Sequence, residues 1–306
     1  MKIVSVNISE KKGTVKRPVE SIRLNALGVE QDAHAGRWHR QVSLLGVESF
    51  ARFSKAAGRE LAWGEFAENL TTEGLILHEC RIFDRFRIGD VELEVTQIGK
   101  ACHGDGCAIY REVGNCVMPK EGIFCRVISG GEVTPGVSFS YHPKTMKVLV
   151  LTLSDRAFAG EYSDRSGPVV MEKSREILSE ERWPVEVHTE IIPDDAARLQ
   201  QIVEQRVPHY DLVFTTGGTG LGPRDITIDT LLPYLHKEIP GVMDMIRMTY
   251  GAKNPNALIS RSVAGLINQT ILFALPGSVK AVNEYMTEIG KVLPHLIYMV
   301  QGIDKH

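Results

Sequence analysis

The chain has 306 residues, a formal net charge of −3 and a hydrophobic fraction of 43%. The length suits two domains and the composition suits a soluble globular protein, while the slightly negative charge gives no electrostatic basis for general nucleic-acid binding. No apolar run approaches the roughly 20 residues that span a bilayer. Since no export signal is recognisable at the N-terminus, we expect a cytoplasmic protein that binds neither nucleic acid nor membrane.

The first part of the chain, residues 1–142, favours short strands over long helices. Residues 3–8, 91–95 and 124–128 alternate or run apolar over strand lengths, and glycines separate such segments. One helix is expected at 46–57. This pattern predicts a mostly β, barrel-like domain.

A small basic cluster lies in this first part. It comprises His34, His39 and Arg40, with Arg37 beside them. Histidine and arginine together suit an anionic ligand such as a phosphate or an oxyanion, and Asn69 either caps a turn or lines the same pocket. The alternative is a solvated loop whose charges are partly paired.

All five cysteines of the chain also lie in the first part: Cys80, Cys102, Cys107, Cys116 and Cys125. An odd number without an export signal argues against a disulfide framework, and the spacing matches no common zinc or iron–sulfur pattern. Cys80 and Cys125 are expected in the core.

Cys102 is the best candidate for a reactive thiol. It follows an apolar strand pattern and stands between Lys100 and His103, whose positive charge favours the thiolate. Cys116 is the second candidate and would act as a resolving thiol. The alternative for either residue is a buried or idle thiol.

The second part, residues 146–306, alternates strands with helices. Strand candidates at 147–153, which is almost wholly apolar, and at 185–192, 212–215 and 270–275 are separated by segments with helical periodicity. This order predicts an α/β domain with a mostly parallel sheet covered by helices on both faces. Ligands of such folds bind at the carboxyl ends of the strands.

The segment 211–225, D-L-V-F-T-T-G-G-T-G-L-G-P-R-D, carries the strongest functional pattern. A strand that runs into a glycine loop and then a helical pattern exposes backbone N–H groups to an anion. The expected phosphate-binding residues are Thr216, Gly217, Gly218, Thr219 and Gly220. Asp225 adds a carboxylate that would hold Mg²⁺ beside bound phosphates. The alternative is a turn that only connects two elements.

Other candidate ligand-binding residues follow the neighbouring strands and are therefore expected in the same cleft. They are Ser154, Asp155, Asp194, Pro276, Gly277 and Ser278. Asp155 is equally suited to cap a loop, and Ser278 either caps a helix or contacts the nucleotide.

The second part resembles the molybdopterin-binding domains of the Mog/MoaB type, which also occur in gephyrin. The matching motifs are T-T-G-G-T-G-L-G-P-R-D, S-D-R at 154–156, P-D-D at 193–195, I-P-G at 239–241, S-R at 260–261 and L-P-G-S at 275–278. Ile228 and Val279 stand where this family usually has proline, and Asp244 where it has glutamate.

This resemblance implies transfer of AMP from Mg-ATP to molybdopterin, which gives adenylyl-molybdopterin and pyrophosphate. Asp194 and Asp225 would be the catalytic residues and would hold Mg²⁺ or orient the pterin. The family's trimers or larger assemblies imply a homo-oligomer, and the molybdenum-inserting enzyme of the pathway is an expected partner.

The first part resembles the MOSC domain, a β-rich module tied to the sulfur chemistry of the molybdenum cofactor. The strings are G-V-E-Q-D-A-H-A-G at 28–36, H-R-Q-V-S-L-L at 39–45 and G-E-F-A-E-N-L-T-T-E-G at 64–74. The resemblance implies that this domain binds the cofactor or carries sulfur, with Cys102 as the sulfur-carrying cysteine.

The hypothesis for the whole chain is a two-domain enzyme of molybdenum cofactor biosynthesis. One alternative is a storage protein that binds molybdopterin or the cofactor without turnover. A second is a MOSC sulfurtransferase for which the other domain acts as recruiter. The pattern leaves open whether molybdenum or tungsten is used.

Overall fold

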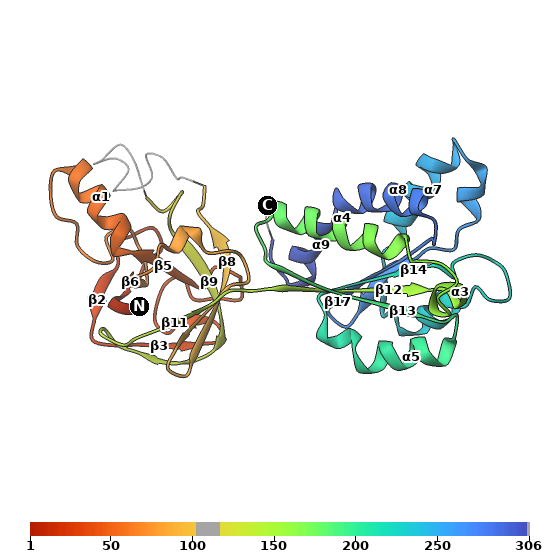
Figure 1. The fold of residues 1–306 in the computed structure, drawn as a ribbon. Coiled ribbons are helices and arrows are strands. Elements are labelled where there is room, and N and C mark those ends of the chain that lie inside the picture. The colour runs from red at the N-terminus through yellow and green to blue at the C-terminus, as the bar shows by residue number, and fades with distance from the viewer. Residues whose placement is uncertain (102–116, 305–306) are drawn as a thin grey trace. The chain divides into compact units, whose positions relative to one another are not determined.

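The computed structural model describes residues 1–101 and 117–304, which form two compact units, Met1–Lys144 and Thr145–His306 (Figure 1). Cys102, Cys107 and Cys116 lie outside the described residues, so the predictions for Cys102 and Cys116 remain predictions. Within the described ranges, no helix combines the length and the apolar character needed to cross a membrane.

The first unit is built mainly of strands. They are β1 (Lys2–Ile8), β2 (Arg17–Val19), β3 (Ile22–Asn25), β4 (Gly28–Val29), β5 (Val42–Gly46), β6 (Leu70–Glu73), β7 (Arg85–Ile88), β8 (Val91–Ile98), β9 (Ile123–Ser129), β10 (Gly131–Val133) and β11 (Ser140–His142). The helix α1 (Val47–Ala57) lies where one was expected, and a 3₁₀ turn, η1 (Leu77–Glu79), follows β6. The prediction of a mostly β unit is confirmed.

Two sheets organise these strands. The larger has the order β11-β7-β8-β9-β5-β6-β1-β2, and the smaller has the order β10-β3-β4. Among the described residues no ladder joins β11 to β2, so closure into a barrel stays a prediction. The strands of this unit enclose a main apolar core, and a smaller apolar cluster includes Phe50 of α1. The Phe50 ring contacts the rings of Trp63 and Phe66 edge-on, with centroid distances of 4.7 and 5.0 Å.

The second unit is a sheet with helices on both faces. Its strands are β12 (Met146–Leu153), β13 (Val185–Ile192), β14 (Leu212–Thr216), β15 (Lys237–Glu238), β16 (Ala264–Ile267) and β17 (Thr270–Leu275). Its helices are α3 (Asp155–Phe158), α4 (Ser166–Glu180), α5 (Ala196–Gln205), α6 (Thr227–Leu231), α7 (Pro240–Gly251), α8 (Val279–Gly290) and α9 (Leu293–Val300), with 3₁₀ turns η3 (Val207–His209), η4 (Leu232–Tyr234) and η5 (Pro255–Ile259). Helices α4 and α8 cover one face and α5 the other (Figure 1).

The sheet is mixed, with the order β13-β12-β14-β17-β16-β15. The strands β12, β13, β14 and β17 run parallel, as predicted, whereas β16 is antiparallel to β17 and β15 to β16. In register, Leu153 pairs with Ile192, Thr152 with Thr216, and Thr216 with Leu275. The segments that follow these four strands therefore begin at one edge of the sheet.

The centre of the sheet offers a test of the core. Phe214 and Phe273 are partners in register, both are fully buried, and their rings stack with centroids 5.4 Å apart. We expect Phe214→Ala to lower the free energy of unfolding by about 3–5 kcal/mol, because it removes buried contacts and leaves a cavity. Urea denaturation, followed on the transition of the second unit, measures this.

The control is Phe158→Ala, since the side chain of Phe158 is 60% exposed. Its expected change is about 0.5 kcal/mol or less. Equal losses in the two variants would contradict the role of the stacked pair.

Candidate functional site

A cavity of about 280 Å³ opens at the carboxyl edge of the second unit's sheet. It is lined by Leu153, Ser154, Asp155, Arg156, Asp194, Gly218, Gly222, Pro223, Arg224 and Asp225. The fold thus brings together several residues that the sequence suggested. Arg156 and Arg224 were not among the predicted site residues, although Arg156 belongs to the S-D-R motif and Arg224 to the G-P-R-D motif.

Asp155 and Asp194 join the loops that follow β12 and β13. The backbone N–H of Asp155 donates to Asp194 Oδ2 at 3.1 Å, and that of Asp194 donates to Asp155 Oδ1 at 3.0 Å. Burial, followed by the negative charges of Asp155 and Asp225, raises the pKa of Asp194 above its usual value. The cavity therefore has an excess of negative charge that a bound cation would relieve.

Asp225 belongs to a tight turn. Its Oδ2 accepts the N–H of Gly222 at 2.8 Å, and its own N–H donates to Gly222 O at 3.0 Å. A Cβ at position 220 would come within 2.7 Å of the Asp225 carboxylate. Glycine at 220 therefore lets the loop close around this carboxylate.

The glycine loop also lies directly against the end of β12. Gly217 has φ +103°, and a Cβ there would collide with the carbonyl oxygen of Leu153. Gly218 has φ +62°, and a Cβ there would collide with the Thr227 hydroxyl. Both positions require glycine on conformational and steric grounds.

Thr216 and Thr219 of the loop are both buried. Thr216 is fully buried, and its hydroxyl donates to Pro276 O at 2.9 Å. Thr219 is 6% exposed, and its carbonyl accepts the N–H of Arg261 at 3.1 Å. Contacts of these two side chains with a phosphate remain predictions.

The two serines of the site are both helix caps. Ser154 Oγ accepts the N–H of Ala157 at 3.3 Å and lies 2.9 Å from the Tyr162 hydroxyl. Ser278 Oγ accepts the N–H of Ala281 at 3.2 Å, which supports the capping alternative. The segment 276–278 packs against the glycine loop, since a Cβ at position 277 would lie 3.3 Å from the Gly217 Cα.

The residues fit a magnesium ion that also binds substrate. Within 1–101 and 117–304, no three His, Cys, Asp or Glu side chains are grouped so as to hold a metal ion alone. Mg²⁺, however, is commonly held by one or two carboxylates together with water and phosphate oxygens. Asp194 and Asp225, which line one negatively charged cavity, meet that requirement.

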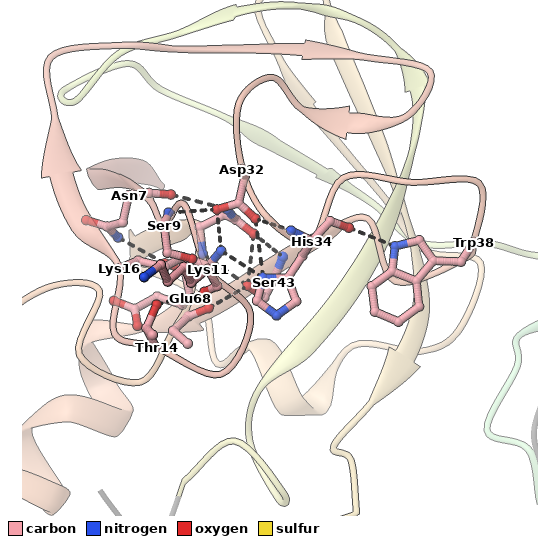
Figure 2. Close-up of polar contacts among 12 residues, drawn as sticks. Asn7, Ser9, Lys11, Thr14, Lys16, Asp32, His34, Trp38, Ser43 and Glu68 are labelled. Carbon is pink, nitrogen blue, oxygen red and sulfur yellow. Dashed lines mark hydrogen bonds and ion pairs between the residues drawn. The ribbon is translucent and has the colours of Figure 1, made fainter. Parts of the chain in front are cut away.

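The first unit contains a buried charged network (Figure 2). Lys16 and Asp32 form an ion pair, with both side chains 1% exposed, and Asp32 Oδ2 also accepts the N–H of Ser9 at 3.0 Å. His34 Nδ1 lies 3.3 Å from Lys16 Nζ and 3.4 Å from Asp32 Oδ1. Lys16 and Asp32 were not identified from the sequence, where no motif links Lys16 to Asp32 and His34, which lie 16 or more residues further along the chain.

Burial shifts the charge balance of this network. It lowers the pKa of Lys16, against the opposing effect of Asp32. Burial alone would raise the pKa of Asp32, but hydrogen bonds from His34 and Lys16 outweigh it and hold that pKa well below its usual value. The Asp32 carboxylate is therefore held ionised inside the unit.

The other residues of the predicted anion pocket lie in different settings. The Arg40 guanidinium lies 4.8 Å from the Trp38 ring centroid, and Trp38 Nε1 donates to His34 O at 2.9 Å. The carbonyl of His39 accepts the Thr96 hydroxyl. Neither contact tests the binding of an anion by His39 or Arg40.

Asn69 belongs to the core. Its side chain is 1% exposed, donates to Asn7 O at 3.1 Å and accepts the N–H of Ser43 at 3.1 Å. The amide thus links β6 to β1 and β5. A contact between this amide and a ligand stays a prediction.

The described cysteines are core residues, as predicted. Cys80 and Cys125 are both buried, and neither is in a disulfide bond. Burial raises the pKa of Cys80 to about 12 and raises that of Cys125 as well. Neither is therefore a reactive thiolate at neutral pH.

Glu68 is fully buried beside the network of the first unit. Its Oε1 accepts the Gly64 N–H and the Thr71 hydroxyl, while Oε2 has no partner among the described residues. Burial raises the pKa of Glu68 to about 7. The folded unit thus binds a proton here more tightly than the unfolded chain does.

The raised pKa of Glu68 predicts a pH-dependent stability. The contribution of protonated Glu68 is fully present below the unfolded pKa of about 4.5 and is lost as the pH rises through about 7, a loss on the order of 3 kcal/mol. We expect Glu68→Gln to reduce the fall in the first unit's stability between about pH 5 and pH 8. Urea denaturation over this range measures it, with the exposed Glu20→Gln as control. An unchanged pH dependence in Glu68→Gln would refute the assignment.

Known proteins match both units. Residues 149–295 match the family described as probable molybdopterin binding domain, and residues 31–140 match the MOSC domain. A molybdopterin adenylyltransferase of Helicobacter pylori is 34% identical over 161 residues, which cover 52% of this chain and 90% of that protein. The chain belongs to the molybdopterin adenylyltransferase family.

Other relatives are longer than the matched segment. The molybdenum cofactor biosynthesis bifunctional protein of Chlorobaculum tepidum is 35% identical, over 53% of this chain and 50% of that protein. Gephyrin of Dictyostelium discoideum is 35% identical, over 51% of this chain and only 23% of that protein. The tungsten cofactor synthesizing protein MoaB of Pyrococcus furiosus, a solved structure, has 30% identity and a TM-score of 0.46, over 52% of this chain and 99% of that one.

Proposed function

We propose that the second unit, residues 146–306, transfers AMP from Mg-ATP to molybdopterin in molybdenum cofactor biosynthesis. The products are adenylyl-molybdopterin and pyrophosphate. The observation that carries the proposal is the cavity at the carboxyl edge of the sheet, where Asp155, Asp194 and Asp225 meet a glycine loop. Its chemistry suits a metal–nucleotide complex.

The chain's part in this reaction is to position charged groups. Transfer of a nucleotidyl group depends on orientation and charge neutralisation more than on covalent catalysis by the protein. Asp194 and Asp225 would hold Mg²⁺, which neutralises phosphate charge when bound. Asp155 fixes the orientation of Asp194 through their reciprocal backbone contacts, and Gly218 and Gly222 let the loop backbone approach a phosphate closely.

For the first unit, residues 1–142, the proposal is that the MOSC domain binds the cofactor or carries sulfur on Cys102. His34, His39 and Arg40 would face the anionic group of the ligand. The proposal also includes assembly of the chain into a homo-oligomer, the molybdenum-inserting enzyme as a partner and a cytoplasmic location. They are supported by the resemblance and the composition.

Pyrophosphate release from Mg-ATP in the presence of molybdopterin tests the proposal. Asp225→Asn should lower it by about 100-fold or more, because the charge for the metal is lost while an oxygen remains to accept the Gly222 N–H. Pterin binding should persist. The control is Asp229→Asn, whose carboxylate is 63% exposed and paired with Arg261.

Two results would favour the alternatives. If the wild-type protein binds molybdopterin yet releases no pyrophosphate, the second unit is a storage module. If pyrophosphate release is absent and sulfur transfer stops in Cys102→Ser, the chain is a sulfurtransferase with a recruiting domain.

The pH profile of the reaction provides a separate test of the carboxylates. Asp194 must be ionised to hold a cation, and its pKa is raised, so the acid limb of kcat/KM should lie above the usual aspartate range. Asp155→Asn should move this limb to lower pH, because it removes a negative charge while keeping an oxygen for the Asp194 N–H. Steady-state assays from about pH 4 to pH 8 would show the shift. A limb at the same pH in both proteins would argue against coupling between the two carboxylates.

A further inference from the structure

Two arginines line the carboxylate cavity, and their side chains are held differently. The Arg156 guanidinium packs over the Tyr162 ring at 5.2 Å from its centroid. The Arg224 side chain is 77% exposed, and its ion pair with Asp155 is long, at 3.9 Å. Arg224 is therefore the cation of this cavity with the greater freedom to reorient.

The backbone that carries Arg224 is fixed. Pro223 precedes it, the N–H of Asp225 donates to Gly222 O, and the N–H of Ile226 donates to Arg224 O at 3.0 Å. The N–H of Gly222 in turn donates to the Asp225 carboxylate. A hydrogen-bonded turn thus carries the exposed Arg224 side chain, which lines the cavity.

The charges that line the cavity suit the Arg224 guanidinium for binding a phosphate. Asp155, Asp194 and Asp225 line this cavity together with Arg224, so a bound phosphate would meet both the metal site and the guanidinium. A planar guanidinium matches phosphate oxygens with two parallel N–H donors. Exchange of the long, exposed contact with Asp155 for a phosphate would cost little.

We propose that Arg224 is a catalytic residue that leaves Asp155 and binds the β-phosphate of the nucleotide as pyrophosphate departs. This inference rests on the proposed function. An oxygen of the acceptor's phosphate forms a bond to the α-phosphorus, and the bond from that phosphorus to the α–β bridging oxygen breaks. Pyrophosphate leaves with the electron pair, and the guanidinium stabilises the charge that develops on it without losing its proton.

The test compares Arg224→Met with the wild type in pyrophosphate release from Mg-ATP and molybdopterin. We expect kcat and kcat/KM to fall together by about 100-fold, because the contact is made in the transition state. Binding of a non-hydrolysable α,β-methylene analogue of ATP should change by about threefold or less. The kcat of Arg224→Lys should lie between those of the wild type and Arg224→Met, since lysine keeps the positive charge but lacks the two parallel N–H donors of a guanidinium.

The matched control is Arg175→Met, which removes an exposed arginine from α4 and should leave the rate unchanged. Added guanidinium should restore turnover in Arg224→Ala, because the side chain's site is open to solvent. An unchanged kcat in Arg224→Met, a rise in KM alone, or a lack of rescue would each overturn the inference.

The two proposals fail in different ways. If the wild type turns over and Arg224→Met equals it, only the role of Arg224 is wrong. If the wild type releases no pyrophosphate, the proposed function fails and the inference falls with it.

Discussion

The close approach of Gly217 to the carbonyl of Leu153 is the constraint on which the candidate site depends. Strands β12 and β14 run parallel and side by side, so the chain that leaves β14 must pass directly over the end of β12. Only a residue without Cβ fits there, and the positive φ of Gly217 favours glycine as well. This contact sets the glycine loop beside Asp155 and Asp194, and the turn around Asp225 completes the cavity.

The two units arrange their charged groups in opposite ways. In the first, Lys16 and Asp32 are paired inside the protein, and His34 contacts both. In the second, three carboxylates share a solvent-accessible cavity, and the nearest cations are exposed or stacked on a ring. A paired network stabilises and orients its own members, whereas an excess of one charge favours a ligand of the other. The second arrangement therefore supports binding of a cation with its phosphates.

Most strands of the second unit could be predicted from the amino-acid sequence. Apolar runs indicated β12, β14 and β17, because strands covered on both faces contain few polar residues. The edge strand β13 contains polar residues and could be recognised only as a strand-length segment. The short antiparallel strands β15 and β16 were missed, since a strand as brief as Lys237–Glu238 has no periodicity to detect. In the site, the motifs suggested Asp155, Asp194 and Asp225 together. The motifs could not show that the Thr216 hydroxyl donates to Pro276 O or that Ser278 Oγ accepts the N–H of Ala281.

The sequence by itself determined the two-domain organisation, the mostly β character of the first domain, the α/β character of the second and the family, because apolar periodicity and motif order are local properties of the chain. Only the tertiary structure decided which side chains share a space. Lys16 meets Asp32 and His34, which are two residues apart in the chain, because the fold brings it back from 16 residues before Asp32. The environment of Arg224 was decided in the same way, since its contact with Asp155 spans the loops of two strands. Pairings between distant segments follow from sheet register, which no short stretch of sequence encodes.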